Sequence, residues 1–418
     1  MTYGVPEWAS AAIWYSVYPL GACGAPIREP DIAGEYHRLG RLLGWLDHVV
    51  AVGANGLALG PIWASSTHGY DVVDHDAIDP RLGDDHDFDQ LIGACHQRGL
   101  KVLLDGVFNH VSVRHEDVQR ARTDGVESPF GQLFRHDEKQ ADGLARFEGH
   151  EGLVEYDHSN PAVAERVAAT MLRWLDRGAD GWRLDAAYRV PRAFWAVVTE
   201  RVKSRYPNSL TVAEVLHGNY AAFAAETGVD SVTQYELWKA IWSSLKEHNP
   251  HELAWALQRH ETGMADGAFL PWTFVGNHDV SRITTQIGGH DALIAAALLS
   301  VLPGMPAIYY GDELGFTGVK EERIGGDDAI RPALSDEPPP FNESMRQYQL
   351  LFGFRRRHAW LQWAQLEITD SKHQHLAFRL TPSRKIPGQD RVVNVTLDAT
   401  GASNHLVVAD DSGESFSL

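Results

Sequence analysis

Four short segments carry the residues of this sequence that could do chemistry. In chain order they are Asp105–His110, Gly181–Asp185, Ala213–Val215 and Phe274–Asp279, and each closes a short apolar run with carboxylates, histidines or both. Cleavage of a glycosidic bond needs one carboxyl group as general acid and a second as nucleophile or base. The four segments supply three carboxylates, one arginine and two histidines for such a reaction: Asp185, Glu214, Asp279, Arg183, His110 and His278.

The spacing of these groups predicts separate roles. Arg183 and Asp185 are two residues apart on one strand-like run, so both side chains point to the same side of it. A guanidinium beside a carboxylate favours the ionised form that a nucleophile needs. Glu214 ends an apolar stretch, where desolvation raises the pKa of a carboxyl group toward the range of a general acid. On adjacent strands, we expect the two carboxyls to approach the separation of about 5–5.5 Å typical of retaining enzymes.

Further side chains are suited to hold a sugar ring. His278, Asp279 and His110 would bind hydroxyl groups, and Tyr70 offers an aromatic face for stacking. Each segment alone also has an ordinary structural interpretation, such as an Asx turn after a strand or a structural ion pair. Because all of them follow strand-like runs in a fixed order, the set favours one shared site.

The elements that must position these residues alternate between strand and helix. Consecutive apolar residues are typical of parallel strands covered on both faces. Eight such runs predict a (β/α)₈ TIM barrel of the α/β class, with active groups at the carboxyl ends of its strands. An open doubly wound sheet is the alternative, but the glycine-rich phosphate turn that it needs is absent. The predicted strands are 13–20, 56–62, 101–105, 181–187, 210–216, 231–235, 269–275 and 306–310.

The same sequence pattern divides the chain into three regions. The polar stretch 111–157 interrupts the alternation and has the length of a functional insertion. After about residue 361, alternating runs at 376–380, 392–396 and 405–409 predict a small all-β unit. We predict a catalytic barrel over 1–110 and 158–361, an insertion over 111–157 and a C-terminal β domain over 362–418. Helices are predicted at 42–52, 88–97, 161–175, 191–206, 237–257, 291–302 and 343–357.

Composition narrows the class of partner. The net charge of −19 over 418 residues argues against nucleic acid or an anionic membrane surface, since both need a basic face. A neutral oligosaccharide substrate is compatible with that charge. The two cysteines, Cys23 and Cys95, predict neither a disulfide framework nor a zinc site. With no signal-peptide pattern and no membrane-length apolar run, we expect a cytoplasmic location.

These motifs, in this order, resemble those of the α-amylase superfamily of retaining α-glycosidases. Two further stretches, Gly69–Asp71 and Gly304–Glu313, are similar to other landmarks of that family. The resemblance implies that Asp185 is the nucleophile, Glu214 the general acid and base, and Asp279 the third carboxylate. It also implies that the insertion is the family's domain B and the tail its domain C. The residues that would contact the glucose at the cleaved bond (subsite −1) are Tyr70, His110, Arg183 and His278.

Flanking residues refine what the resemblance implies. Calcium-binding members usually carry a Lys-His pair after the nucleophile strand, where this chain has Tyr188 and Arg189. Asn109 matches one calcium-ligand position, but one ligand does not make a site, so we expect no metal and no cofactor. Glu214-Val-Leu-His217 is close to the Glu-Val-Trp-His of cyclomaltodextrinases and neopullulanases, with Leu216 at the tryptophan position.

The expected substrates are therefore short or cyclic maltooligosaccharides, cyclic maltosyl-maltose among them. The N-terminal dimerisation domain of those relatives is not expected, because the barrel would start at about Ile13; the oligomeric state, a homodimer included, stays open. Alternatives on the same site are a transglycosidase and a sucrose- or trehalose-type α-glucosidase. A non-catalytic amylase-like scaffold is disfavoured, because all three carboxylates are kept.

Overall fold

A closed parallel barrel forms the centre of the molecule. The computed structural model describes residues 4–28, 34–264, 269–383, 391–400 and 403–418. In these ranges eight parallel strands make one sheet: β1 (Trp14–Val17), β2 (Gly56–Leu59), β5 (Lys101–Gly106), β8 (Gly181–Leu184), β9 (Leu210–Ala213), β10 (Ser231–Val232), β11 (Trp272–Phe274) and β12 (Met305–Tyr309).

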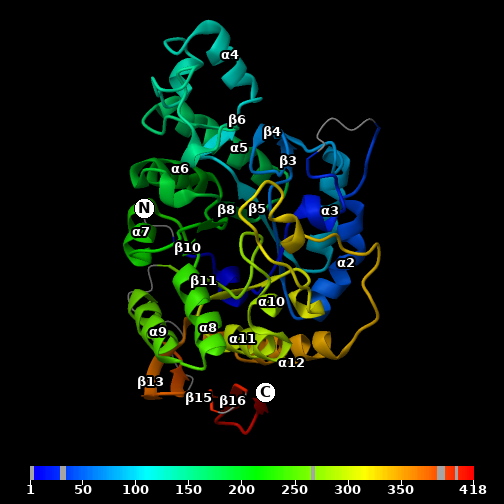
Figure 1. The fold of residues 1–418 in the computed structure, drawn as a ribbon, viewed down its shortest axis with the longest axis vertical. Coiled ribbons are helices and arrows are strands. Elements are labelled where there is room, and N and C mark those ends of the chain that lie inside the picture. The colour runs from blue at the N-terminus through cyan, green and yellow to red at the C-terminus, as the bar shows by residue number, and fades with distance from the viewer. Residues whose placement is uncertain (1–3, 29–33, 265–268, 384–390, 401–402) are drawn as a thin grey trace.

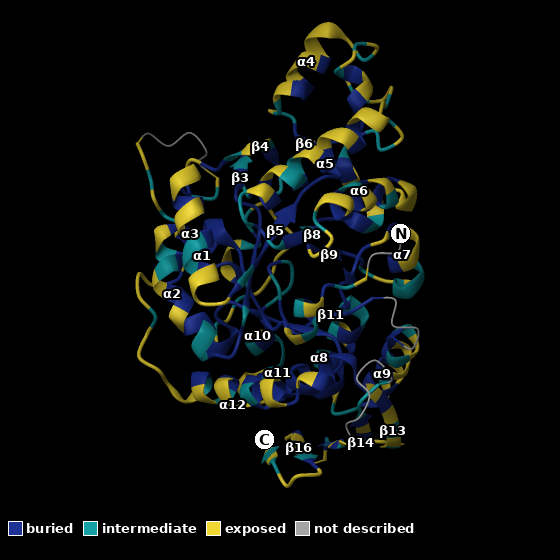
Figure 2. Ribbon diagram, turned by 180° about the vertical axis from the view of Figure 1, so that it is seen from behind, coloured by how far each residue is buried: buried dark blue, intermediate teal, exposed yellow. Residues whose placement is uncertain are grey.

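The order of the strands confirms the predicted TIM barrel. The sheet runs β10-β9-β8-β5-β2-β1-β12-β11, and a parallel bridge between Thr233 and Trp272 joins its two ends. All residues of β2, β9 and β12 are buried, as the continuous apolar runs predict. Figure 2 shows these buried strands at the centre, with the exposed faces of the helices around them.

Helices cover the outside of the barrel. Their apolar faces pack on the strands and their polar faces meet solvent. Their bounds are α1 (Pro19–Ala22), α2 (Gly40–Ala51), α3 (Asp85–Gln97), α5 (Pro161–Asp176), α6 (Arg192–Arg205), α7 (Tyr220–Thr227), α8 (Tyr235–Glu247), α9 (His251–Met264), α10 (Ile283–Ile287), α11 (Gly289–Val301) and α12 (Glu343–Arg357).

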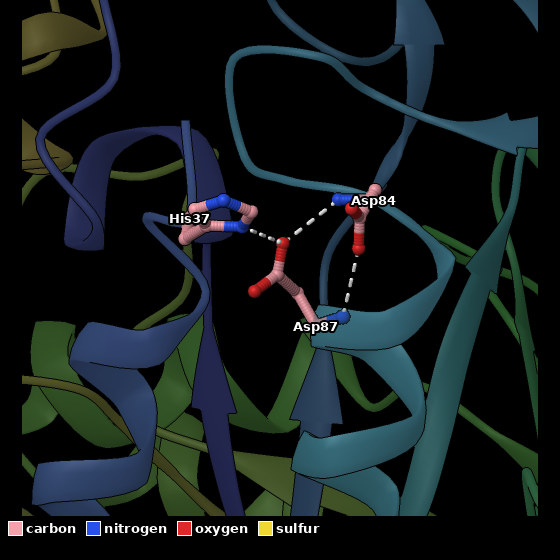
Figure 3. A group of neighbouring side chains, drawn as sticks. All are labelled: His37, Asp84 and Asp87. Atoms are coloured by element: carbon pink, nitrogen blue, oxygen red, sulfur yellow. Dashed lines mark hydrogen bonds and ion pairs between the residues drawn. The ribbon is translucent and has the colours of Figure 1, made fainter. Parts of the chain in front are cut away.

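The start of α3 shows how local sequence fixes a helix end. The Asp84 carboxylate accepts the backbone N–H groups of His86 and Asp87, and the Asp87 carboxylate accepts the Asp84 N–H at 2.9 Å. This reciprocal pair is a capping box. His37 Nδ1 lies 2.8 Å from the same Asp87 oxygen (Figure 3). Because these contacts all serve the helix start, we assign the group a structural role.

One predicted helix is wrong. The stretch 237–257 is two antiparallel helices, α8 and α9, instead of one. The break lies at His248, which adopts the left-handed conformation (φ 51°), and at Pro250, whose ring lacks an N–H and cannot continue a helix. The two helices lie side by side (Figure 1).

The segment between β5 and α5 has more regular structure than its sequence pattern suggested. β6 (His110–Ser112) pairs antiparallel with β7 (Leu153–Glu155), and α4 (Glu116–Asp124) lies between them in sequence. This segment projects from the barrel at the top of Figure 1. A short antiparallel pair, β3 (Trp63–Ser65) and β4 (Val72–Ile78), carries the Tyr70 loop. The limits 111–157 of the insertion stay a prediction.

A separate antiparallel sheet follows the barrel. In the described residues it has five strands: β13 (Gln365–Lys372), β14 (His375–Thr381), β15 (Val393–Asp398), β16 (His405–Asp410) and β17 (Ser415–Ser417). The sequence pattern predicted only the middle three, because β13 is mostly polar and β17 is very short. No helix within the described ranges is long and apolar enough to cross a membrane.

Candidate active site

Arg183 lies at the centre of a buried cluster of carboxyl groups. Its Nη1 donates to Asp105 at 2.9 Å and to Asp185 Oδ1 at 3.0 Å, and its Nη2 lies 2.8 Å from Glu214 Oε1. Asp105 is in β5, Asp185 directly follows β8 and Glu214 directly follows β9. These three strands are neighbours in the barrel. The fold therefore joins three segments that are distant in sequence on one guanidinium.

Glu214 is held by several donors besides Arg183. The Ala186 N–H donates to its Oε2 at 2.8 Å, and the Tyr235 hydroxyl donates to its Oε1 at 3.0 Å. Asn277 in turn donates to the Tyr235 oxygen at 2.9 Å. Ala186 has the left-handed conformation (φ 45°), which non-glycine residues rarely adopt. This turn directly after Asp185 directs a backbone N–H at the carboxylate of Glu214.

Asp279 contacts a histidine and an arginine. Its Oδ2 is 2.9 Å from His278 Nε2 and its Oδ1 is 3.3 Å from Arg331 Nη2. Burial alone would raise the pKa of Asp279, but His278, Arg331 and Arg183 together hold that pKa well below its usual range. These contacts favour the ionised form of Asp279.

Tyr70 links the two sides of the cluster. Its hydroxyl lies 3.0 Å from Asp105 Oδ2 and within hydrogen-bond distance of His278 Nε2. Its ring stacks on the His278 imidazole, with ring centroids 5.2 Å apart. Burial raises the pKa of the Tyr70 hydroxyl far above 10, so it stays a neutral donor. Tyr70 thus reaches the predicted site, where its ring packs on a histidine.

His110 lies beside this group as a neutral imidazole. Burial lowers its pKa to about 3. Its Nε2 is 3.0 Å from the Tyr70 carbonyl, which can only accept, and the Asn109 amide lies 3.2 Å from its Nδ1. The proton is therefore on Nε2. One face of the ring stacks on Phe147 from the insertion, at 4.4 Å. His110 was predicted to contact sugar; in this structure its Nε2 fixes the Tyr70 loop.

The protonation of the central cluster differs from the expectation. Burial raises the pKa of Asp185 well above its usual range, and the charge of Glu214 adds to this, while Arg183 acts in the opposite direction. Burial likewise raises the pKa of Asp105 against the effect of Arg183. The direction of this shift runs against the expectation that Arg183 favours the ionised form of Asp185. One guanidinium faces three buried carboxyl groups, and their mutual repulsion opposes its effect on the pKa of Asp185.

All seven predicted site residues lie in or beside this cluster, and sequence reasoning missed several neighbours. Asp105 had a signal, because it begins the first of the four segments. Tyr235 is the last residue of a predicted strand, but nothing in its sequence context marks it. Arg331 comes from the long loop after β12 and Phe147 from the insertion, where the sequence has no periodicity to place a side chain.

The residues around Asn109 do not fit a calcium ion. Calcium takes six to eight oxygen ligands, mostly carboxylates and carbonyls. In the described part of the chain, the Asn109 amide faces a nitrogen of His110, and its backbone carbonyl accepts the Tyr156 N–H at 3.1 Å. Tyr188 and Arg189, which replace the family's Lys-His pair, contact Glu148 instead. We therefore assign calcium no role in the chemistry of this site.

Comparisons with known proteins agree with this geometry. Neopullulanase 2 of Thermoactinomyces vulgaris is 29% identical over 388 residues, which cover 86% of this chain and 65% of that protein. Intracellular maltogenic amylase of Bacillus subtilis (strain 168) is 26% identical over 422 residues, covering 92% and 69%. The chain thus spans about two thirds of the length of these relatives.

A solved structure shows the same fold. The cyclic α-maltosyl-(1→6)-maltose hydrolase of Arthrobacter globiformis, in complex with cyclic α-maltosyl-(1→6)-maltose, superposes with a TM-score of 0.82 at 23% sequence identity. The match covers 99% of this chain and 100% of that one. The sequence profile described as "Alpha amylase, catalytic domain" matches residues 38–374, which is most of the chain. The chain therefore belongs to the alpha-amylase family.

Proposed function

We propose that this chain is a retaining α-glucoside hydrolase that acts on short or cyclic maltooligosaccharides. The observation that carries the proposal is the contact of Arg183 with Asp105, Asp185 and Glu214 at the ends of three adjacent strands. Relatives named neopullulanase and maltogenic amylase, and a neighbour bound to a cyclic maltosyl-maltose, support the substrate class. Hydrolysis of cyclic maltosyl-maltose is the specific activity that we would test first.

The reaction would use two carboxyl groups in two steps. In the first step, Glu214 gives its proton to the glycosidic oxygen while an Asp185 oxygen attacks C1, so the leaving group departs as an alcohol and a glycosyl ester forms. In the second step, Glu214 takes a proton from water as the water oxygen attacks C1 and the ester bond breaks. Two inversions at C1 leave the product in the α configuration.

Substrate binding has to move the proton of the cluster. The mechanism needs an ionised Asp185 and a protonated Glu214, whereas burial and the charge of Glu214 favour a protonated Asp185 in the free enzyme. Both carboxyls contact Arg183, so they belong to one coupled set. We infer that the arriving glycosidic oxygen, which takes the proton of the acid in the first step, favours the arrangement that the mechanism needs.

Neighbouring groups would hold the sugar ring. Asp279 contacts His278 and Arg331, which favour its ionised form. Its carboxylate can accept hydrogen bonds from two hydroxyl groups of the glucose at subsite −1. It also stabilises the positive charge that develops on the ring in the transition state. Tyr70 and His278 would supply the wall against which the ring rests.

The remaining proposals concern cofactors, location and partners. We propose that the enzyme needs no cofactor and no metal, and that it acts in the cytoplasm, in keeping with the name of the intracellular maltogenic amylase of Bacillus subtilis and with two unpaired, buried cysteines. The acidic surface again argues against nucleic acid as a partner. The oligomeric state, a homodimer included, is to be measured.

The test is the Asp185→Asn variant assayed on linear, branched and cyclic glucooligosaccharides. We expect kcat to fall by at least about 1,000-fold, because the nucleophile is lost. The matched control is Asp124→Asn, which alters an exposed aspartate at the end of α4 and leaves the cluster intact. Substantial residual turnover in Asp185→Asn would refute the assignment of the nucleophile.

Product analysis separates the alternatives on the same site. Proton NMR of the first products should show the α anomer, and a β anomer would exclude the retaining mechanism. At high substrate concentration, oligosaccharides longer than the input would identify a transglycosidase. Preferential cleavage of sucrose or trehalose in the same panel would identify the α-glucosidase alternative.

A further inference from the structure

The α8–α9 hairpin borders a groove that the proposed mechanism does not use. A cavity of about 300 Å³ lies between the loop after β9 and the two helices, and it adjoins a larger one of about 720 Å³. Cavities of this size accommodate small-molecule ligands. We call the smaller cavity the Trp255 groove; its lining includes Leu216, Tyr235, Trp238, Lys239, Glu252 and Trp255.

Trp255 presents an open aromatic face to this groove. Its side chain is 55% exposed, which is unusual for a residue of this size. The Arg259 guanidinium lies 4.7 Å from the ring centroid and is held in place by Glu236 at 3.0 Å. Arg259 lines the larger cavity but not the Trp255 groove. Trp255 lines both cavities, so its indole borders the groove as well.

Tyr235 connects the groove to the catalytic cluster. Tyr235 lines the Trp255 groove, and it also lines an inner cavity of about 50 Å³ that reaches Arg183. Its hydroxyl donates to Glu214. Leu216, at the near end of the groove, is two residues after Glu214. A general acid protonates the leaving-group oxygen, so the space beyond Glu214 belongs to the leaving group.

We propose that the Trp255 groove binds glucose units on the leaving-group side of a maltooligosaccharide, with Trp255 as the stacking platform. This inference rests on the proposed function and adds a preference for substrates with several glucose units beyond the cleaved bond. Lys239 and Glu252, ion-paired at 2.5 Å beside the indole, supply donors and acceptors for sugar hydroxyls. An apolar ring face flanked by such polar groups matches a sugar better than it matches an apolar peptide.

The experiment compares long and short substrates in Trp255→Ala and Trp255→Phe. In Trp255→Ala, KM for maltohexaose should rise roughly tenfold relative to KM for 4-nitrophenyl α-glucoside, as expected for the loss of one aromatic contact. Trp255→Phe should restore most of the difference, because it keeps a ring. The matched control is Leu350→Ala on α12, a similarly exposed apolar residue (56%) that does not line the groove.

Three outcomes would overturn the proposal. They are an unchanged KM ratio in Trp255→Ala, no recovery of the ratio in Trp255→Phe, and a change of oligomeric state in light scattering, which would make the groove a protein contact. Calorimetric titration of Asp185→Asn with maltohexaose, with and without Trp255→Ala, measures binding without turnover. If the wild-type chain hydrolyses nothing, the proposed function fails, but roughly tenfold weaker binding in the double variant would still support the groove.

Discussion

Buried charges are arranged differently at the two ends of the barrel. At the carboxyl ends of β5, β8 and β9, one guanidinium faces three carboxyl groups. At the amino end of β10, the Lys203 Nζ lies 2.6 Å from Asp230, and both side chains are almost fully buried. Asp230 also accepts the N–H and the hydroxyl of Thr211, at 2.8 and 2.9 Å. One end has excess negative charge, whereas at the other cation and anion are matched.

This difference distinguishes a cluster that can act on a ligand from an ion pair that only stabilises the fold. A matched pair with its hydrogen bonds satisfied has nothing left to offer a ligand, so its contribution is to the folded state. An unmatched cluster has perturbed pKa values and charge that its own cation does not balance, which is typical of a functional site. In TIM barrels the carboxyl end is where activity is expected and the amino end is where stability is expected.

The largest expected effect is on activity. Arg183→Met removes the cation that all three carboxyls share, and we expect kcat/KM to fall at least about 100-fold. Unfolding by urea should also become easier, because three buried carboxyls lose their shared cation, so activity is compared per folded molecule. Steady-state kinetics and denaturation on the same preparation check both statements. A large loss of stability with normal activity per folded molecule would reverse the comparison.

A substitution at the amino end of the barrel should lower stability and leave activity per folded molecule unchanged. Lys203→Met leaves Asp230 buried without its cation, which should lower the free energy of unfolding by about 3–5 kcal/mol. Activity per folded molecule should stay near the wild-type value, because Lys203 does not contact the catalytic cluster. The double variant Lys203→Met/Asp230→Asn should recover part of the lost stability. If it recovers none, the pair is not the source of the effect.

A smaller effect concerns the pH dependence of stability. In the folded protein the pKa of Asp185 is raised above its ordinary 3.8, so the folded state binds that proton more tightly than the unfolded chain. Stability is therefore lost as pH rises from about 3.8 through the raised pKa. Asp185→Asn should increase the free energy of unfolding at pH 7 by about 1 kcal/mol. The gain should vanish below pH 3.8 in urea titrations, and a gain at every pH would contradict this account.

The smallest effect should come from Tyr235→Phe. It removes the hydroxyl that donates to Glu214 but leaves the Arg183 and Ala186 contacts in place. We expect kcat to fall roughly fivefold, as for the loss of one hydrogen bond to a charged group. An unchanged kcat would reduce Tyr235 to a packing residue.

The sequence predicted the barrel because its strands are short, continuous apolar runs that end in polar residues. The same ends identified Asp185, Glu214 and Asp279, since carboxylates are rare directly after buried strands. The helix break at His248–Pro250 was missed because apolar periodicity continues on both sides of it. Arg331 could not be found, because a long loop has no period that would place its side chain.

The protonation state of the cluster could not be predicted for a different reason. Sequence shows Arg183 beside Asp185, but it does not show that Asp105 and Glu214 reach the same guanidinium. A pKa depends on every charge within several ångströms and on burial, and both come from the fold. The sequence therefore pointed to the acidic residues of the cluster, but it could not predict the shifts of their pKa values.

The stack of Phe147 on His110 limits how the insertion can evolve. Phe147 also packs with Leu153 from β7 and with Ala186, the residue directly after Asp185. One small apolar cluster thus belongs to both the insertion and the catalytic turn. The insertion is consequently not an exchangeable module: a segment transplanted from a relative would have to bring a side chain that fits this cluster. Variation in substrate range would come more easily from the α8–α9 side.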